Sequence, residues 1–342
     1  MYRNRVRENN PVARETIVLT RPQIAAEVDI VAGIDAIELA MGEFEKGQDY
    51  LPPKAIFEIP VGEPDGAYAA CITGYTQATD LLTMKLGQER TGNPEHGLPT
   101  TNSWIPAFHP QTGELLMICD GTLPTMYRTA AAAAVAARQL ARNDATTLAV
   151  IGAGQLGRQC LRAVSSVRPF KQIYLADMVP DAAQAVADEL GATLSMAITV
   201  ADAQAACSNA DVIVTATNSR DPIISEQWVQ PGTHLSCMGT DLPDKIECEM
   251  SLLPKCRKFA DMIEHALKRG EVSQAVEQGV LDEDCYVGTL GQVINGDVPG
   301  RTANDQITMY DGVGIGIQDT TIVKTIYDQA IQKNLGTRIC FS

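Results

Sequence analysis

The sequence predicts an α/β fold in which a doubly wound parallel sheet is joined to a second, α+β domain. Three observations support this prediction. Residues 147–158 form a buried strand pattern that runs into the glycine turn Gly152-Ala-Gly154 and then into a helix. Strand and helix patterns alternate from there to about residue 261, as in a parallel sheet covered on both faces. Residues 51–119 instead show short strand-like runs between Gly, Pro, Asp and Asn, which favour antiparallel hairpins.

Length and composition limit the possible function classes. A chain of 342 residues is long enough for about two domains, and 45% hydrophobic with 20% charged residues is ordinary for a soluble protein. The net charge of −15 repels nucleic acid and anionic membranes, so neither is expected as a partner. Nine cysteines without CxxC spacing predict free thiols in a reducing compartment, and hence the cytoplasm. We expect the polar first 14 residues to form a frayed arm.

The first part of the chain is expected to begin with one long helix. Thr20 can cap it, and the apolar spacing continues toward Gly47, although Gly33 weakens the middle. Strands of a largely antiparallel sheet are then expected at residues 55–59, 67–73, 81–86, 101–108 and 115–119. An alanine-rich helix follows at residues 129–142. We place the crossing between the domains at Asn143-Asp144, which breaks this helix.

In the second part of the chain, expected strands alternate with expected helices. Strands are expected at residues 148–151, 173–176, 211–216, 234–238 and 258–261, and helices at residues 155–167, 181–190 and 201–206. Helical stretches near residues 262–268, 272–278 and 290–295 come next. A strand at 306–310 and a helix at about 316–332 complete the prediction.

The glycine turn has the spacing of a dinucleotide site. Gly152 allows the tight turn, Gly154 lets the backbone approach a pyrophosphate, and Gly157 lets the helix pack close to the strand. The phosphates would then meet free N–H groups at the positive end of the helix. Asp177 ends the second strand at the distance expected for an acid that binds the adenosine ribose. Because a carboxylate there repels a 2′-phosphate, we expect NAD rather than NADP.

Four residues are candidates to face the nicotinamide. In an open parallel sheet, reactive groups lie at the carboxyl ends of the strands and on the neighbouring domain. Lys54, Lys85, Arg128 and Asp241 fit this description. Arginine can hold a carboxylate through two parallel hydrogen bonds, a lysine supplies a point charge, and an aspartate can transfer a proton. The set therefore suits an α-amino or α-imino acid as substrate.

Each candidate also has an ordinary structural interpretation. Lysines are usually solvated surface charges, so Lys54 and Lys85 need no function. Arg128 could cap a helix or form an ion pair. Asp241 follows Gly239-Thr240 and could be a turn residue, because turns select Gly and Asp.

Several motifs change this balance, because together they resemble the ornithine cyclodeaminase and μ-crystallin family. They occur in family order over about residues 51–326: Gly97-Leu-Pro-Thr-Thr101, Thr112-Gly-Glu114, Leu123-Pro-Thr-Met-Tyr-Arg-Thr-Ala-Ala-Ala132, Ala136-Ala-Arg-Gln-Leu-Ala-Arg142, Val150-Ile-Gly-Ala-Gly154, Asp211-Val-Ile-Val-Thr-Ala-Thr-Asn-Ser219, Met238-Gly-Thr-Asp241, Pro299-Gly-Arg301, Tyr310-Asp-Gly-Val-Gly314 and Ile317-Gln-Asp319.

The resemblance implies a homodimer with a Rossmann domain at residues 129–316 inserted into a substrate-binding and dimerisation domain at residues 1–128 plus 317–342. Lys85 matches the family's active-site lysine, Arg128 its substrate-carboxylate arginine and Asp241 its catalytic aspartate. Lys54 stands where the family usually has a second arginine, and a lysine cannot form the bidentate fork. The implied NAD contacts are Arg128, Thr129, Gly152, Gly154, Gln155, Leu156, Asp177, Thr215, Thr217, Ser219, Met238, Gly239 and Val313. No metal ligand is predicted.

Activities of this family divide by the fate of the imine that forms when an amino acid gives up hydride. A cyclodeaminase returns the hydride to a cyclised imine, so NAD is not consumed, whereas in a reductase or dehydrogenase hydride transfer is the net reaction. No acid in the first half can be placed against an ornithine tail, although Glu58, Asp65 and Glu89 are possibilities. Arg90 and His96 could instead serve a second carboxylate.

Residues 232–241 also look more like the iminosuccinate-reductase branch. We therefore expect an NADH-dependent reductase of a small α-imino acid, with the conversion of iminosuccinate to aspartate as the candidate reaction, that also works as an amino-acid dehydrogenase. Two alternatives stay open. One is an ornithine or lysine cyclodeaminase, and the other is a non-enzymatic ligand-binding protein like μ-crystallin.

Overall fold

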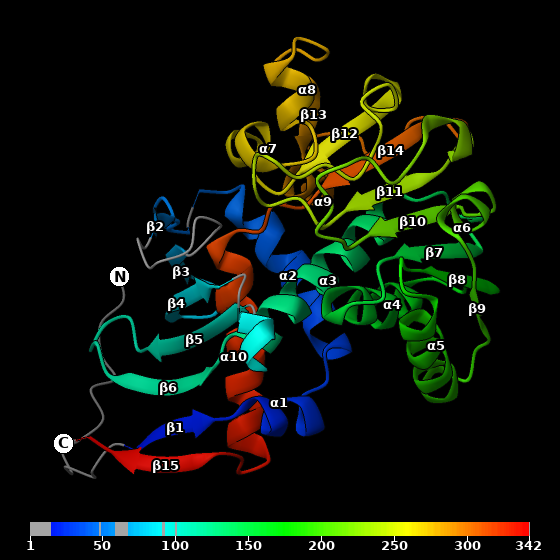
Figure 1. Ribbon diagram of the computed structural model, residues 1–342. Coiled ribbons are helices and arrows are strands. Elements are labelled where there is room, and N and C mark those ends of the chain that lie inside the picture. The colour runs from blue at the N-terminus through cyan, green and yellow to red at the C-terminus, as the bar shows by residue number, and fades with distance from the viewer. Residues whose placement is uncertain (1–14, 48, 59–67, 91–92, 100, 342) are drawn as a thin grey trace.

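The computed structural model describes residues 15–47, 49–58, 68–90, 93–99 and 101–341. Two sheets stand side by side, with helices between them (Figure 1). The polar arm predicted for residues 1–14 lies outside the described residues.

The sheet formed by the second part of the chain has eight strands in the order β13-β12-β14-β11-β10-β7-β8-β9. Every neighbouring pair in it is parallel, which confirms the predicted parallel sheet. Its central strands are almost wholly buried on both faces, and most of their residues are apolar, although β11 also buries His234 and Ser236. β9 and β13 were not predicted. The strands are β7 (Thr147–Ile151), β8 (Gln172–Ala176), β9 (Ile198–Val200), β10 (Val212–Thr215), β11 (His234–Cys237), β12 (Cys256–Ala260), β13 (Tyr286–Thr289) and β14 (Ile307–Asp311).

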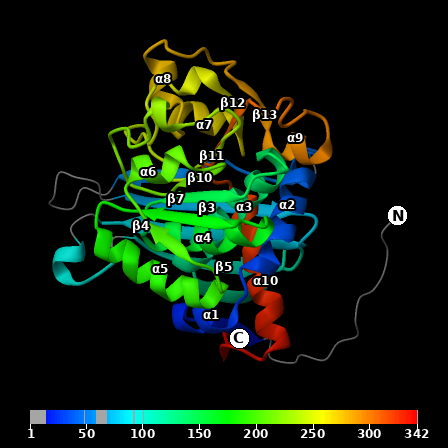
Figure 2. The same ribbon diagram turned by 90° about the vertical axis from the view of Figure 1, so that its right-hand side faces the viewer.

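Helices cover both faces of this sheet. Figure 2 shows α4 and α5 on one side of the strands and α6 on the other, as a doubly wound fold requires. The helices of this part are α4 (Gln155–Val167), α5 (Pro180–Leu194), α6 (Ala203–Ser208), α7 (Ile263–Arg269), α8 (Ser273–Glu277) and α9 (Leu290–Asn295), with short 3₁₀ turns at Glu226–Trp228 and Leu253–Lys255.

The other sheet has seven strands in the order β15-β1-β6-β5-β4-β3-β2. All its pairs are antiparallel except β1 with β6, so the predicted, largely antiparallel sheet is confirmed. The strands are β1 (Glu15–Leu19), β2 (Ala55–Glu58), β3 (Tyr68–Thr76), β4 (Leu81–Glu89), β5 (Thr101–Phe108), β6 (Leu115–Asp120) and β15 (Thr337–Cys340), and a 3₁₀ turn at Asn93–His96 precedes β5. The sequence did not reveal β1 and β15, because short strands at chain ends have little periodic signal.

Two helix predictions were wrong in their limits. The single helix expected near the N-terminus is two helices, α1 (Arg21–Glu27) and α2 (Val31–Phe44), because the backbone is extended at Val28 and the Asp29 carboxylate accepts a hydrogen bond from Val31 N that starts α2. The alanine helix α3 (Thr122–Leu140) begins seven residues earlier than residue 129, because the Asp120 carboxylate accepts a bond from Leu123 N. It therefore runs without a break through the predicted domain limit at 128/129.

Three helices join the two sheets, namely α2, α3 and α10 (Gly316–Gln332) (Figure 1). Residues 130–137 of α3 are all buried, and seven of the eight are alanines, which are small enough to allow close helix packing. Gly33 lets α2 pack closely against α10, since a Cβ on Gly33 would lie 2.5 Å from Ile322 Cδ1. Gly74 on β3 meets α10 in the same way: its Cβ would lie 2.6 Å from the carbonyl oxygen of Gly316.

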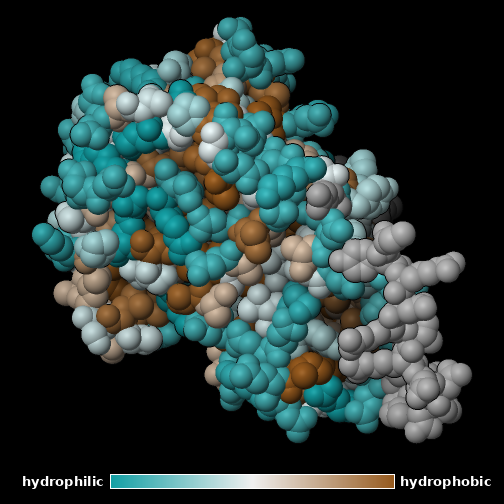
Figure 3. Space-filling model, turned by 180° about the vertical axis from the view of Figure 1, so that it is seen from behind, coloured by the Kyte–Doolittle hydropathy of each residue, from teal (hydrophilic) through white to brown (hydrophobic). Residues whose placement is uncertain are grey.

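Hydrophilic side chains dominate the surface seen from behind, and apolar side chains reach it in separate patches (Figure 3). This agrees with the net charge of −15. Among the described residues, no helix is long and apolar enough to cross a membrane.

We predict that Gly74→Ala destabilises the protein by on the order of 1–3 kcal/mol, because the methyl group overpacks the contact between β3 and α10. The measurement is chemical denaturation of the purified protein. Gly87→Ala on the neighbouring strand β4 is the matched control, since nothing lies within 4 Å of a Cβ there. Equal stability of the two variants would contradict the packing argument.

Candidate active site

A buried ion pair lies where β4 meets the first turn of α10. Lys85 Nζ is 3.0 Å from Asp319 Oδ1 and 2.8 Å from Oδ2. Lys85 lies inside β4 rather than after it, and strand alternation points its side chain to the same face as Thr83, which bonds Thr320 on α10. Both partners are almost fully buried, so a sheet strand and a helix bring a charged pair out of water.

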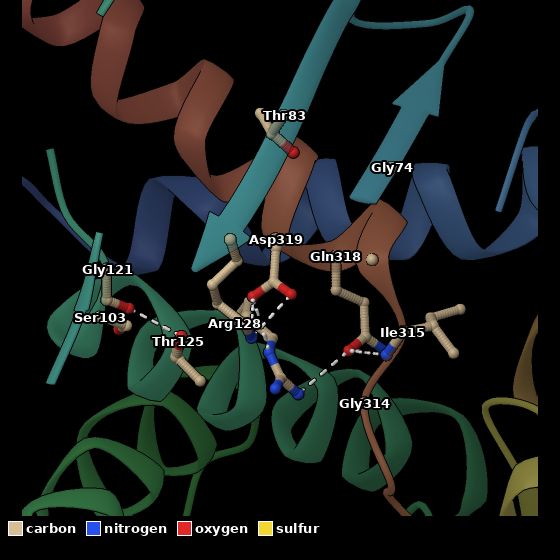
Figure 4. A network of polar contacts seen from close by, with 12 residues as sticks. Gly74, Thr83, Ser103, Gly121, Thr125, Arg128, Gly314, Ile315, Gln318 and Asp319 are labelled. Atoms are coloured by element: carbon tan, nitrogen blue, oxygen red, sulfur yellow. Dashed lines mark hydrogen bonds and ion pairs between the residues drawn. The ribbon is translucent and has the colours of Figure 1, made fainter. Parts of the chain in front are cut away.

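Arg128, in the second turn of α3, joins the same carboxylate (Figure 4). Its Nε is 3.2 Å from Asp319 Oδ1, and its Nη1 is 3.4 Å from Gln318 Oε1. Nη2 donates no hydrogen bond to any residue that the structure describes, so that edge of the guanidinium is available to a ligand. Gly314 makes room for the group: its φ is +73°, and a Cβ there would lie 2.1 Å from Arg128 Nη1.

Lys54 approaches this cluster from the segment before β2. Its Nζ lies 3.4 Å from the carbonyl oxygen of Val313, which follows β14. Asp261, at the end of β12, accepts bonds from Gly314 N at 2.6 Å and from Gln318 Nε2 at 3.4 Å. The structure thus brings together Lys54, Lys85 and Arg128 with two buried carboxylates, which leaves one positive charge uncompensated.

Burial and mutual repulsion shift the pKa values in this cluster. Burial, offset in part by Asp319, lowers the pKa of Lys85 to about 8. Burial and the charge of Arg128 also lower the pKa of Lys54. Burial alone would raise the pKa of Asp319, but the charges of Lys85 and Arg128 outweigh it and hold the pKa below its usual value. Lys85 can therefore exchange a proton close to neutral pH.

Asp241 lies apart from the three cations. Its carboxylate is half exposed and pairs with Lys245 Nζ at 2.7 Å. No hydrogen bond or ion pair between described residues joins it to Lys85 or Arg128, although its charge is near enough to raise the pKa of Lys54. The catalytic role of Asp241 stays a prediction.

The glycine turn has the geometry that its spacing predicts. Gly152 has a φ of +108°, and a Cβ on Gly157 would lie 1.8 Å from the Gly152 carbonyl oxygen, so α4 packs tightly on β7. A Cβ on Gly154 would meet nothing within 4 Å. The protein itself therefore does not require a glycine at 154, whereas a phosphate close to this backbone would. These residues fit a dinucleotide.

Asp177 lies directly beside the glycine turn. Its Oδ2 accepts a bond from Ala153 N at 2.7 Å, and its Oδ1 accepts one from Val179 N at 2.8 Å. Each carboxylate oxygen keeps a free lone pair, as a ribose hydroxyl would need. Met178, the next residue, is 97% exposed and offers an apolar surface beside it.

The other predicted cofactor contacts fall into two groups. Gly154, Gln155 and Leu156 open α4 at the surface of the glycine turn. Thr215, Thr217, Ser219, Met238, Gly239 and Val313 follow the ends of β10, β11 and β14, at the same sheet edge. Thr129 differs from both groups, since its hydroxyl bonds Thr125 O within α3. The cofactor role of each residue stays a prediction.

Sequence reasoning missed Asp319 and Lys245 as partners of the predicted residues. Two buried cations need a nearby anion, and this requirement could have drawn attention to Asp319 in the motif Ile317-Gln-Asp319.

Of the acids considered for an ornithine tail, Asp65 lies outside the described residues, as do the side chains of Glu58 and Glu89. The buried side chains of Cys237, Cys248 and Glu271 have ligand atoms within 4.8 Å of one another, so the predicted absence of a metal stays a prediction.

A family model described as the ornithine cyclodeaminase/mu-crystallin family matches residues 14–334. The chain belongs to this family. Among curated relatives, it is 32% identical to alanine dehydrogenase of Archaeoglobus fulgidus, over 96% of this chain and 99% of that one. It is 30% identical to iminosuccinate reductase of Paracoccus denitrificans, over 94% and 99% of the two chains.

Solved structures of the family superpose over almost the whole chain. An archaeal alanine dehydrogenase dimer with bound NAD gives a TM-score of 0.89 at 30% identity, over 96% of this chain and 100% of that one. The Δ1-pyrroline-2-carboxylate reductase of Thermococcus litoralis, in complex with NADH and L-proline, gives a TM-score of 0.89 at 28% identity, over 95% of this chain and 100% of that one. A lysine cyclodeaminase gives a TM-score of 0.83 at 28% identity, over 96% of each chain.

We predict that Asp319→Asn destabilises the protein by about 3–5 kcal/mol, because it leaves two buried cations without an anion. The folded-state pKa of Asp319 is below its unfolded value, so the carboxylate's contribution is fully present at pH 7 and is lost only as the pH falls through the folded pKa. The measurement is denaturant unfolding at pH 7.

Asp328→Asn is the matched control for this prediction. It removes an exposed pair with Lys324 on the same helix, which is worth only about 0.3–0.5 kcal/mol. If the two variants unfold at the same denaturant concentration, Asp319 does not hold the cluster together.

Proposed function

We propose that this member of the family is an NAD(H)-dependent reductase of a small α-imino acid that also runs in reverse as an amino-acid dehydrogenase. The observation that carries the proposal is the cluster of Lys54, Lys85 and Arg128 at the sheet edge where the glycine turn lies. Strands β7 and β14 are parallel members of one sheet, so Gly152 and Val313, which follow them, lie at the same edge. A nucleotide on the glycine turn would extend toward the cations.

The uncompensated positive charge favours a substrate that carries a carboxylate. Arg128 offers Nη2, and Nη1 once its long contact with Gln318 is released, so two parallel bonds to a carboxylate are within its reach. Lys54 adds a point charge, without the fork of an arginine. Bound NADH supplies hydride to the imine carbon.

Proton handling falls to Lys85 and Asp241 in this proposal. With a pKa of about 8, Lys85 is protonated at neutral pH and can keep the imine nitrogen protonated, which makes the carbon a better hydride acceptor. Asp241 would exchange a proton with nitrogen or water from the opposite side, once its ion pair with Lys245 has opened. The product amine then leaves as an ammonium ion.

Iminosuccinate is our first candidate for the substrate itself. The support is the resemblance of residues 232–241 to that branch, the 30% identity to the Paracoccus enzyme, and Arg90 and His96, which follow β4 and could receive a second carboxylate. Cyclodeamination of ornithine or lysine is the alternative, since a lysine cyclodeaminase shares the fold at a TM-score of 0.83. A cytoplasmic location also remains a proposal, based on the nine free cysteines.

We predict that the protein oxidises NADH when it is given oxaloacetate, pyruvate or glyoxylate with ammonia, and that oxaloacetate is used best. Loss of NADH absorbance measures the reaction. NADPH should serve at least tenfold less well, because Asp177 repels a 2′-phosphate. Formation of proline and ammonia from ornithine with catalytic NAD would establish the cyclodeaminase instead, and no turnover on any of these substrates would favour a ligand-binding protein.

We predict that Lys85→Ala lowers turnover by about 10²–10⁴-fold while NADH affinity changes little. The wild-type kcat/KM for the imino acid should fall above about pH 8, where Lys85 loses its proton, and this fall should vanish in the variant. Asp241→Asn should also slow turnover, whereas Asp244→Asn, which breaks the exposed pair with Arg220, should not. An equal loss of NADH binding and turnover in Lys85→Ala would point to a folding role.

We also propose that the protein is a homodimer, joined through the outer face of the seven-stranded sheet. Leu86 and Trp104 pair across β4 and β5 on this face and are about half exposed, although both are large and apolar. We predict that Trp104→Lys yields monomers in light scattering, whereas Met178→Lys, on an exposed loop of the other sheet, leaves the mass unchanged. A wild-type protein with the mass of one chain would refute this proposal.

A further inference from the structure

Glu247 is a fully buried carboxylate that takes no part in the chemistry proposed above. It lies in the segment between β11 and β12, where its backbone carbonyl accepts bonds from Ile223 N and Ile224 N. Its side chain accepts four hydrogen bonds. Oε2 accepts from Thr215 Oγ1 at 2.6 Å and Gly239 N at 3.0 Å, and Oε1 accepts from Thr217 N and Thr217 Oγ1, both at 2.8 Å.

These donors come from two neighbouring strands. Thr215 ends β10 and Thr217 follows it, while Gly239 follows β11. A Cβ on Gly239 would lie 2.2 Å from Thr217 O and 2.5 Å from Glu247 Oε1, so the two strand ends and the carboxylate are in tight contact. The side chain of Glu247 therefore fixes the spacing between the ends of β10 and β11.

A second buried carboxylate holds Glu247 in turn. Glu271 accepts from Glu247 N at 3.1 Å with each oxygen, and its Oε1 accepts from Cys248 N at 2.6 Å. Both of its oxygens are thus already engaged by backbone N–H groups. Burial raises the pKa of both glutamates. Burying such groups is costly, and the four hydrogen bonds to Glu247 offset that cost only while the ends of β10 and β11 keep their places around it.

We propose that Glu247 is a positioning residue for the nicotinamide half of the cofactor. The inference rests on the proposed NAD(H)-dependent function. In a doubly wound sheet, each half binds one mononucleotide, and β7, β8 and β9 form the half that carries the glycine turn and Asp177. Strands β10, β11 and β14 form the other half, and each hydrogen bond that the side chain of Glu247 accepts from a described residue comes from the ends of β10 and β11.

Cofactor fragments separate the two halves experimentally. ADP carries the adenosine ribose and pyrophosphate but lacks nicotinamide. In Glu247→Gln an amide NH₂ would face donors that now meet a carboxylate, so the two strand ends must shift. We expect the variant to bind NADH at least about tenfold more weakly in a fluorescence titration, and ADP within twofold of wild type by calorimetry.

Glu249→Gln is the matched control. Its carboxylate likewise accepts a hydroxyl and a backbone N–H, from Ser225 and Glu226, but it does not bond the ends of β10 and β11. This variant should bind both ligands as wild type does. If Glu247→Gln fails to fold, Glu247→Asp keeps the carboxylate but shortens its reach to both strand ends, and it should weaken the binding of NADH but not of ADP, in the same direction.

Two results would overturn the inference: unchanged NADH affinity in the variant, or equal weakening of NADH and ADP. Both differ from a failure of the NAD(H)-dependence on which the inference rests. In that case the wild-type protein itself would bind neither NADH nor ADP.

Discussion

The charge balance at Asp319 is the constraint on which the candidate site depends. One buried carboxylate on α10 faces Lys85 from β4 and Arg128 from α3, so it holds together three elements from distant parts of the chain. It cannot neutralise both cations, and Lys54 adds a third. The remaining positive charge is a cost that a bound carboxylate would relieve, since opposite charges attract strongly where water is excluded. Burial, with a smaller contribution from the charges of Arg128 and Lys54, lowers the pKa of Lys85 to about 8, which makes its proton mobile.

The parallel sheet gives this cluster its place. Because all eight strands run in one direction, every strand ends at the same edge, and the residues that follow them meet there. Asp177, Thr215, Gly239, Asp261 and Val313 all end or follow strands of this sheet. The start of α4 lies at this edge as well, and the backbone N–H groups in the first turn of a helix favour anions, so the edge combines an anion-binding helix start with buried carboxylates.

Close backbone contacts keep this geometry rigid. Gly157 brings α4 onto β7, Gly314 gives space to the guanidinium of Arg128, and Gly74 admits α10 to the seven-stranded sheet. Any side chain at these positions would displace an element that carries a candidate residue. The positions of Lys85 and Asp319 therefore depend on glycines that have no part in the chemistry themselves.

The amino-acid sequence by itself determined the parallel and antiparallel sheets, the dinucleotide turn and the family, because these depend on local periodicity and on motifs a few residues long. It also indicated Lys54, Lys85 and Arg128, which the fold brings together. Only the tertiary structure decided that β1 and β15 extend the second sheet, that Asp319 pairs with two of the cations, and that Asp241 pairs with Lys245. The first two depend on contacts between residues far apart in the sequence, for which neither spacing nor composition carries a signal. The third depends on the turn that brings Asp241 back to Lys245, four residues later.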